Sequence, residues 1–377
     1  MTLRIVEDLA EIDTAQWDAL RKTTAGDNPF LAYAFLRALQ DSGCATPTTG
    51  WRAQFLTLWR DARLIGALPL YVKSHSWGEF VFDWAWAEAY AKHGLEYYPK
   101  LVSSVPFTPV TGARLLAESD AARTQLIAAA LQFARDSGVS SLHLLFPPES
   151  QALEMQAQGM LLRKGVQFHW QNPGYPDFAA YLASLRRDKR KKIQQERRRV
   201  NDAGIVFQHL RGEQITPAHW QFFQRCYART HMQFNSPQAL NLDFFLRVGA
   251  AMPENILLII ALKDDEPIAS ALNFYDDYAL YGRSWGTLKY HDGLHFETCY
   301  YQAIEFCIAN RIATFEGGAQ GEHKLARGFL PVTTWSAHWL AHPRFASAVE
   351  EFLQRESGGI ERYVDELNEN SPFKRAT

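Results

Sequence analysis

The sequence predicts an α+β protein in which a mixed α/β plan, a central sheet flanked by helices, is used twice along the chain. The length of 377 residues suggests two domains at roughly 100–200 residues each. A content of 47% hydrophobic and 21% charged residues is that of an ordinary folded protein and excludes disordered and collagen-like chains. Each half also contains a β-hairpin with a charged turn followed by a helix and a strand, an order typical of mixed sheets.

The first half shows alternating strand and helix patterns, punctuated by proline and glycine. The pattern predicts a helix over 33–40, strands over 54–59, 64–72 and 79–82, a helix over 121–135, and strands over 141–146 and 166–170. The loop Asn172-Pro173-Gly174 follows the last strand. We take this loop as the domain boundary, which gives a first domain over 1–173, a basic connecting helix over 174–204 and a second domain over 205–377.

The second half repeats the order of elements. The pattern predicts strand 205–210, helices 217–230 and 242–250, strands 256–262, 268–275 and 279–285, helix 296–310, strands 313–316 and 332–340, and a helix from Pro343. Segment 61–71 aligns with 265–275, and 133–143 resembles 306–316. These short matches indicate an old duplication, although matches of this length also arise by chance.

The overall charge is nearly balanced, with 39 Lys and Arg against 41 Asp and Glu, a formal net charge of -2. This average argues against a protein that binds nucleic acid or an anionic membrane over its whole surface. The acidic start of the chain lacks the apolar core of a signal peptide, and the longest apolar run, 256–262, is far shorter than the roughly 20 residues of a membrane span. We therefore expect a cytoplasmic protein without a transmembrane segment, whose contact with a membrane, where it occurs, is peripheral.

Motifs of several enzyme classes are absent from the sequence. The cysteines at 44, 226, 299 and 307 form no CxxC pair, so we expect reduced thiols and no metal site. There is no GxSxG, HExxH, P-loop or dinucleotide-binding motif. Hydrolases, metalloproteases, kinases and NAD-dependent enzymes therefore lose their usual sequence support.

The segment 186–199 holds nine basic and two acidic residues, so it carries +7 and the rest of the chain carries -9. Apolar residues fall on one stripe of a predicted long helix, at Phe178, Leu182, Leu185, Ile193 and Val200. The stripe would dock the helix and leave the cations in a fixed array that suits phosphate groups. The candidate phosphate-binding residues are Arg186, Lys189, Arg190 and Lys191. A solvated linker helix is the alternative.

A second constellation lies in the glycine-rich segment 315–331, directly after a predicted strand. A glutamate at a strand end can act as a general base, and nearby cations can stabilise an oxyanion or hold a phosphate. The candidate catalytic residues are Glu316, His323 and Lys324. The candidate phosphate- or substrate-binding residues here are Gly317, Gly318, Gly321 and Arg327, since glycine allows close backbone approach to a ligand. An ordinary flexible turn is the alternative.

Two further features are open to more than one interpretation. The aromatic stretch 77–90, with Lys100 after it, offers Asp83, Trp84, Trp86 and Lys100 as the lining of a sugar or peptide groove, although core packing is the favoured interpretation of the aromatic residues. In the predicted helix 296–310, one face bears Glu297, Tyr301 and Glu305, for which we expect contact with solvent rather than with a site.

Five motifs together resemble one bacterial family. They are Asn28-Pro-Phe-Leu31, Tyr97-Tyr-Pro-Lys100, Val105-Pro-Phe-Thr-Pro-Val-Thr-Gly112, Leu280-Tyr-Gly-Arg-Ser-Trp-Gly286 and Phe315-Glu-Gly-Gly-Ala-Gln-Gly-Glu-His-Lys324. Over nearly the whole chain the sequence is similar to the Fem-like branch, linked to peptidoglycan biosynthesis or recognition, of the Gcn5-related N-acyltransferase (GNAT) superfamily. The resemblance implies two tandem GNAT-like domains. Fem relatives transfer an aminoacyl group from aminoacyl-tRNA to an amine of a peptidoglycan precursor, and in them a basic helix resembles 186–199 and a late-loop lysine resembles Lys324.

One departure concerns the acyl donor. Acetyl-CoA enzymes of the superfamily usually carry Q/R-x-x-G-x-G/A where a strand opens onto a helix. Here Arg283, a further candidate phosphate- or substrate-binding residue, and Gly286 fit the pattern. Leu288 takes the last place, which gives weight to a donor other than CoA. We expect an N-acyltransferase with acyl-CoA or aminoacyl-tRNA as co-substrate, no tightly bound cofactor, and a small-molecule or cell-wall-precursor acceptor. The alternative is a non-catalytic module that binds tRNA or another phosphate-rich ligand through the basic helix.

Overall fold

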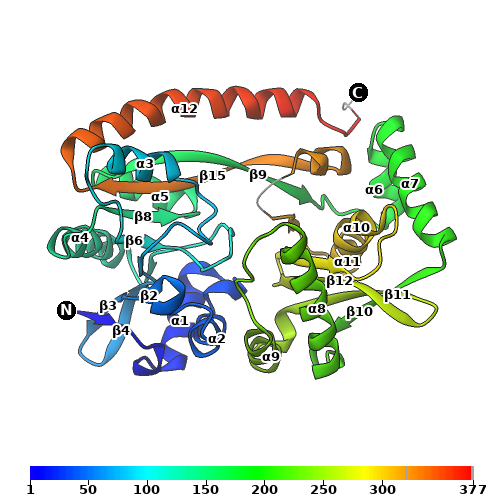
Figure 1. The fold of residues 1–377 in the computed structure, drawn as a ribbon, viewed down its shortest axis with the longest axis horizontal. Helices are drawn as coiled ribbons and strands as arrows, with labels where there is room; N and C mark the ends of the chain where they lie inside the picture. Colours follow the sequence, from blue (N-terminus) through cyan, green and yellow to red (C-terminus); the bar gives the residue numbers. More distant parts are fainter. Residues whose placement is uncertain (319–320, 375–377) are drawn as a thin grey trace. The chain divides into compact units, whose positions relative to one another are not determined.

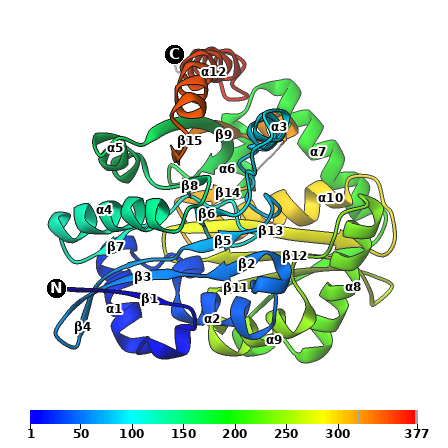
Figure 2. The same ribbon diagram turned by 60° about the vertical axis from the view of Figure 1, so that its left-hand side comes forward.

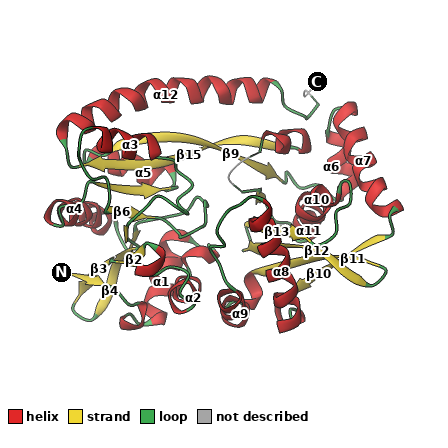
Figure 3. Cartoon of the chain, viewed as in Figure 1, coloured by secondary structure: helices red, strands yellow, loops and turns green. Residues whose placement is uncertain are grey.

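The computed structural model describes residues 1–318 and 321–374. The chain divides into two compact units, each assembled from two stretches of sequence. The first unit comprises Met1–Val166 and Thr333–Tyr363, and the second comprises Gln167–Val332 and the chain from Val364. The predicted connecting helix over 174–204 falls within the second unit, and the chain enters the first unit again near its end. Helices and strands alternate in both units (Figure 3).

The first unit contains two sheets and five complete helices among its described residues. Its strands are β1 (Thr2–Val6), β2 (Trp51–Ala53), β3 (Phe55–Arg60), β4 (Arg63–Leu68), β5 (Tyr71–Lys73), β6 (Lys100–Ser103), β7 (Leu116–Ala117), β8 (Ser141–Leu145) and the end of β15 (Phe329–Leu340). Its helices are α1 (Thr14–Ala25), α2 (Tyr33–Asp41), α3 (Trp84–Lys92), α4 (Asp120–Asp136) and α5 (Glu149–Ala157), followed by most of α12 (Pro343–Glu369). One sheet has the order β1-β3-β4-β7, and the strands β15-β8-β6-β5-β2 follow one another in the other. The pair β6 and β8 is parallel while its neighbours are antiparallel, which confirms the predicted mixed sheet.

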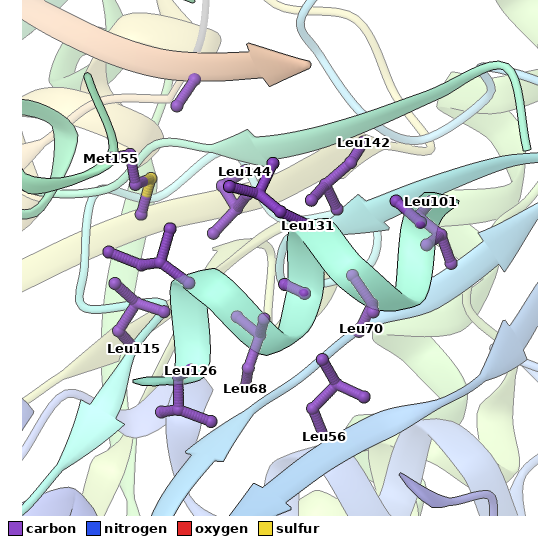
Figure 4. Close-up of a cluster of buried hydrophobic side chains, with 14 of the residues drawn as sticks. Leu56, Leu68, Leu70, Leu101, Leu115, Leu126, Leu131, Leu142, Leu144 and Met155 are labelled. Carbon is purple, nitrogen blue, oxygen red and sulfur yellow. The ribbon is translucent and has the colours of Figure 1, made fainter. Parts of the chain in front are cut away.

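The core of the first unit forms around α4. Leucines of the strands, including Leu56, Leu68, Leu101 and Leu142, are completely buried, and they lie along α4, which contributes Leu126 to the same cluster (Figure 4). Burial of one such side chain contributes about 1.5–3 kcal/mol. The helix predicted over 121–135 from its apolar residues is therefore confirmed as a helix of the core, and Ser119 is its N-cap.

Two strand predictions in the first half are wrong in detail. The segment 79–82 is a loop rather than a strand, because the Glu79 carboxylate turns inward to Lys100 and Phe80 adopts a left-handed conformation with φ of 61°. The predicted strand 64–72 is two strands, β4 and β5. Pro69 lies in the interruption, where it has no N–H to donate to a ladder.

The second unit is built on one mixed sheet of order β10-β11-β12-β13-β14-β9. The strands are β10 (Ile205–Arg211), β11 (Ile256–Lys263), β12 (Glu266–Tyr275), β13 (Ala279–Thr287), β14 (Thr314–Glu316) and the end of β9 (Leu161–Gln171), and only β13 with β14 is parallel. The helices are α6 (Phe178–Ser184), α7 (Arg187–Asp202), α8 (Pro217–Gln233), α9 (Leu242–Ala251), α10 (Leu294–Phe296) and α11 (Gln302–Ala309), together with the π-helical turn η6 (Glu297–Tyr301) and the 3-10 helix η7 (Glu322–Arg327).

Helices cover both faces of this sheet, so its central strands are buried on both sides. Helix α8 packs on β12 and β13, and α9 packs on α8 (Figures 1 and 2). A Cβ on Gly286 would lie 2.0 Å from the carbonyl oxygen of Cys226 in α8, which shows how closely that helix approaches. The residue before Gly286 in the strand, Trp285, points to the opposite face and stacks on His295 at the start of the helical segment 294–309.

The predicted long helix over 178–200 is also wrong in one respect, because it is broken into α6 and α7. Leu185 is extended, with ψ of 153°, and forms a β-bridge with Phe373, while the N–H of Arg186 donates to the carbonyl of Pro372. The C-terminal segment thus supplies backbone partners that outcompete helix continuation. The apolar stripe itself is confirmed at Leu182, Leu185, Ile193 and Val200, all of which are buried.

The fold class predicted from the sequence is confirmed, and the aligned segments occupy equivalent places in the two units. Segments 61–71 and 265–275 each begin at a hairpin turn with a left-handed Asp, and segments 133–143 and 306–316 each lead from a helix into the strand of the parallel pair. Within the described residues, no helix combines the length and the apolar character that crossing a bilayer requires.

Candidate active site

The site begins where two parallel strands of the second unit part. Strands β13 and β14 pair from Ala279–Thr314 to Tyr281–Glu316, where β14 ends, whereas β13 continues to Thr287. Opposite β12, the register shifts so that Arg283 is an extra residue on β13, a β-bulge. Bulges turn side chains out of the regular alternation and occur often beside active sites. Past the end of β14, backbone groups and side chains of β13 are therefore accessible that would be covered if the pairing of the two strands continued.

A pocket of about 100 Å³ lies at this strand end. Its lining combines the bulge, the strand β12 beside it, the helical segment and the first glycine after β14, and includes Asn273, Arg283, Ser284, His295, Cys299 and Gly317. The predicted residues Arg283 and Gly317 are thus brought together, although they lie 34 positions apart in the sequence.

Lys324 is buried beside the pocket, on η7. Its Nζ donates a hydrogen bond of 2.8 Å to the carbonyl of Gly318. Burial, and next to it the charge of Arg283, lowers the pKa of Lys324 to about 8. Gly317 allows this arrangement, because a Cβ there would lie 3.0 Å from the Phe329 ring and 3.4 Å from Cδ of Lys324. The ammonium is therefore closer to losing its proton than an ordinary lysine.

Glu316 stands at the end of β14, half-buried, with Gly317 and Gly318 after it. Burial lowers the pKa of Arg283 to about 10, and the negative charge of Glu316 acts against this shift. The same carboxylate helps to raise the pKa of Tyr281, which burial raises most. One anion and the two cations Arg283 and Lys324 therefore share the strand end, which is a composition suited to proton transfer and to stabilising an oxyanion.

The predicted catalytic residue His323 lies at the rim of this group, and Gly321 precedes it with φ of 123°. The hydroxyl of Tyr300 lies 3.1 Å from Nε2 of His323. Burial, followed by the charge of Arg327, lowers the pKa of His323. At neutral pH the imidazole is thus available as a neutral hydrogen-bonding group.

The site residues that escaped the sequence prediction include His295, Cys299 and Tyr300. His295 lies in α10, and Cys299 and Tyr300 lie in the π-helical segment η6 that follows, which rotates its side chains relative to a regular helix. Burial lowers the pKa of His295 to about 4 and raises the pKa of the Cys299 thiol. The spacing of His295 and Cys299, one helical turn apart, was the available signal.

Arg327, which the sequence predicts to bind phosphate or substrate, is engaged in contacts within the protein. Its guanidinium donates to both carboxylate oxygens of Glu196 at 2.8 and 2.9 Å and to the hydroxyl of Tyr301 at 2.9 Å. It also lies 3.3 Å from the centre of the Phe296 ring. These contacts connect η7, which carries Lys324, to helix α7. The role of Arg327 in phosphate binding stays a prediction.

Helix α7 is held against the helical segment by a second set of charges. Arg197 pairs with Glu297 at 3.0 Å and Glu305 at 2.8 Å. Glu297 and Tyr301 are buried, so the expectation that their face meets solvent is wrong. The reason is that α7, whose contact is not readable from local periodicity, covers that face.

The four predicted phosphate-binding residues lie in the N-terminal half of this basic segment. Arg186 and Lys191 are exposed and Lys189 and Arg190 half-exposed, and Lys189 lies 3.3 Å from Asp188. Within 1–318 and 321–374, Arg186, Arg190 and Lys191 form no ion pair. These cations are on the same unit as the pocket but are not part of its lining.

The predicted groove residues of the first unit separate into two environments. Asp83 and Lys100 are buried and paired with each other, and Lys100 also donates to Glu79 at 2.8 Å. Burial raises the pKa of Asp83, but Lys100, together with His143 and Ser76, outweighs burial and lowers the pKa to about 2. Trp86 is buried with its ring 5.0 Å from that of His338, whereas Trp84 is exposed. Their part in a substrate groove stays a prediction.

Solved structures similar to this chain share its fold. FemX superposes with a TM-score of 0.57 and 10% identity, covering 93% of this chain and 100% of its own. The C-terminal domain of a putative lysylphosphatidylglycerol synthetase from Agrobacterium fabrum has a TM-score of 0.57 and 10% identity, with coverage of 91% and 96%. L-PGS from Bacillus licheniformis has a TM-score of 0.56 and 10% identity, with coverage of 90% and 97%.

None of the curated proteins matches the chain. The FemAB-like family, described as acting in peptidoglycan biosynthesis or recognition, matches residues 8–375. The match spans both units and confirms the resemblance carried by the five motifs. The chain belongs to the FemAB-like peptidoglycan biosynthesis/recognition family.

Proposed function

We propose that this protein is an N-acyltransferase that moves an acyl or aminoacyl group to an amine acceptor at the pocket between β13 and Gly317. The observation that carries the proposal is the grouping of Glu316, Arg283 and Lys324 around a bulged strand end with a pocket. Family membership supports a cell-wall precursor as the acceptor class. The donor, acyl-CoA or aminoacyl-tRNA, is a co-substrate rather than a resident cofactor.

In the proposed reaction, the acceptor amine attacks the carbonyl carbon of the donor and its proton passes to Glu316. The ammonium of Lys324 stabilises the negative charge on the carbonyl oxygen. As the bond from that carbon to the donor sulfur or oxygen breaks, Lys324 supplies the proton that the leaving group takes. Return of the proton from Glu316 to Lys324 restores the starting state. Positioning of both substrates contributes the remainder of the rate.

The test is a transfer assay with two donor arms, acetyl-CoA and aminoacyl-tRNA, and amine-bearing peptidoglycan precursors as acceptors, read by mass spectrometry. Lys324→Ala should lower the rate about 100-fold or more, because it removes both the oxyanion contact and the acid. Lys289→Ala is the matched control, since Lys289 is exposed and pairs only with Glu266 among the described residues. Unchanged transfer in Lys324→Ala would rule out the proposed role.

The exposed cations of α7 support a second candidate, a non-catalytic module that binds tRNA or another phosphate-rich ligand. Counterion release predicts that tRNA affinity then falls with a log–log salt slope of several units. Lys191→Ala with Lys192→Ala should reduce that slope by one to two units, with Lys22→Ala and Lys92→Ala as the charge-matched control. Salt-steep tRNA binding without transfer from either donor favours the module, whereas transfer favours the enzyme.

A further inference from the structure

The loop from Trp77 to Trp84 in the first unit buries its charged side chains and exposes its aromatic side chains. Its carboxylates are buried, with Glu79 at 2% and Asp83 at 3% exposure. Its four largest aromatic side chains are exposed, namely Trp77 at 48%, Phe80 at 41%, Phe82 at 57% and Trp84 at 57%. Folding alone favours the opposite arrangement, because aromatic surface gains from burial and carboxylates lose hydration there. We call residues 77–84 the aromatic loop.

Buried lysines fix the inner side of the aromatic loop. Nζ of Lys100 donates to Glu79 at 2.8 Å, to Ser76 at 2.8 Å and to Asp83. Nζ of Lys73 donates to the carbonyl of Trp77 at 3.1 Å. Both lysines are fully buried. The loop is therefore pinned from inside, and its exposed rings are held in place rather than left on a flexible chain.

The outer side of the loop is held in a conformation that costs free energy. Phe80 has φ of 61°, a left-handed backbone conformation that is rare and strained for a bulky residue. Nη1 of Arg163 donates to the carbonyl of Phe82 at 2.7 Å, and the Phe82 and Trp84 rings meet edge to face at 6.3 Å. The strained turn keeps the Phe80 ring outside while Glu79 stays inside.

The chemistry of the loop separates the possible occupants. A sugar site needs polar groups beside the rings, but Glu79 and Asp83 face Lys100, and the nearby Glu88 pairs with Lys92 at 2.8 Å. Exposure near one half on four side chains of about 200 Å² each adds up to roughly 400 Å² of exposed aromatic surface on the loop, about half of the 800 Å² per partner in a stable protein interface. An uncharged patch of tryptophan and phenylalanine of this size matches the boundary between lipid headgroups and acyl chains.

We propose that the aromatic loop inserts into the interface of a lipid bilayer and attaches the protein peripherally to a membrane. The inference is independent of the transfer reaction, because none of its residues belongs to the second unit. The attraction of the aromatic loop to a bilayer does not depend on the charge of the lipid. Binding of the protein to uncharged vesicles is therefore explained by the loop and not by the cations of α7.

The test is co-sedimentation of the full-length protein with vesicles of phosphatidylcholine alone. The wild type should bind, and Phe82→Ser with Trp84→Ser should lower the affinity about tenfold or more, since both rings leave the bilayer boundary. The matched control is Phe234→Ser with Tyr290→Ser, which removes two rings of the second unit exposed at 73% and 85%. All four side chains are exposed, and circular dichroism checks that both variants fold.

A second readout uses the tryptophans of the loop directly. Brominated phosphatidylcholine should quench part of the wild-type fluorescence, and Trp84→Phe should reduce the quenched fraction while keeping an aromatic side chain at that position. The proposal is overturned if the wild type does not bind the vesicles or if the Phe82–Trp84 variant binds as well as the control. It is equally overturned if light scattering shows a wild-type dimer that this variant breaks, because the patch would then serve a second copy.

Discussion

In the second unit, some charged side chains are engaged in structural ion pairs, whereas others remain available for chemistry. Arg327 uses its guanidinium on Glu196 and Tyr301, whereas Lys324, three residues earlier, is held only by the carbonyl of Gly318 among the described hydrogen bonds. Both residues stood out in the sequence as cations of one glycine-rich segment. Only the packing of α7 against η7 distinguishes them, since Glu196 reaches one and not the other.

The Glu196–Arg327 pair should matter for stability. Glu196→Ala leaves a buried guanidinium without its carboxylate, so we expect a loss of about 3–5 kcal/mol in the free energy of unfolding, measured by urea denaturation. Arg199→Ala is the control, because its pair with Asp292 is exposed at 51% and 65% and should cost less than about 1 kcal/mol. Equal losses in the two variants would contradict the structural role of Arg327.

Lys324 should give the reaction an alkaline limit. Its pKa of about 8 lies below the ordinary 10.5, so transfer that needs the ammonium should decline as the pH rises through about 8. Lys324→Arg should move that decline to higher pH, since arginine keeps its proton. The free energy of unfolding depends on pH in the opposite direction. Between pH 8 and 10.5 the unfolded chain binds more protons at this group than the folded one does, so the group adds stability as the pH rises. The pH–rate profiles of both proteins provide the check, and identical limbs would exclude Lys324 as the titrating group.

Helices and strands were predictable where the sequence signal is local. The predictions were wrong where a distant segment competes for the same backbone groups or side chains. Helix α8 and strands β10 to β13 lie within a few residues of their predicted bounds, because the signals for each are carried by its own residues. The break between α6 and α7 was not predictable, since its cause is a bridge from Leu185 to Phe373, 188 positions later. The turn η6 was missed for a similar reason, as the contacts of Glu297 and Tyr301 with α7 lie outside local sequence.

The contact between α8 and β13 depends on Gly286. Gly286→Ala places a Cβ where the Cys226 carbonyl lies at 2.0 Å, so helix or strand must shift. We expect a loss of about 2 kcal/mol or more in thermal or urea denaturation, at the level of overpacked cores. Gly358→Ala in α12 is the control, because its nearest atom is 4.0 Å away in a flexible arginine side chain. A Gly286→Ala protein as stable as this control would argue against so close a contact.

At the scale of the molecule, the chain order does not follow the two units. Strand β15 pairs with β8 inside the first unit, from Ser336–Leu145 to Leu340–Ser141, although the paired residues are 191 to 199 positions apart in the sequence. A fragment of residues 1–173 therefore leaves one side of β8 unpaired. We expect it to lack cooperative unfolding by circular dichroism, and linkage of 333–363 to its end to restore cooperativity. A cooperative fragment 1–173 would show that this pairing is dispensable.

The sequence by itself determined the family, the mixed α/β class, most elements and the residues of the glycine-rich segment, because these depend on motifs and periods that local residues carry. It also located +7 of charge in 14 residues. Only the tertiary structure decided which charges remain available, since Glu196 and Lys100 meet partners from distant elements. It also decided that Arg283 joins Gly317 and Lys324 at one strand end, and that the carboxylates of the aromatic loop point inward while its rings point outward. These outcomes depend on burial and pairing between distant segments, whose free energies no local pattern contains.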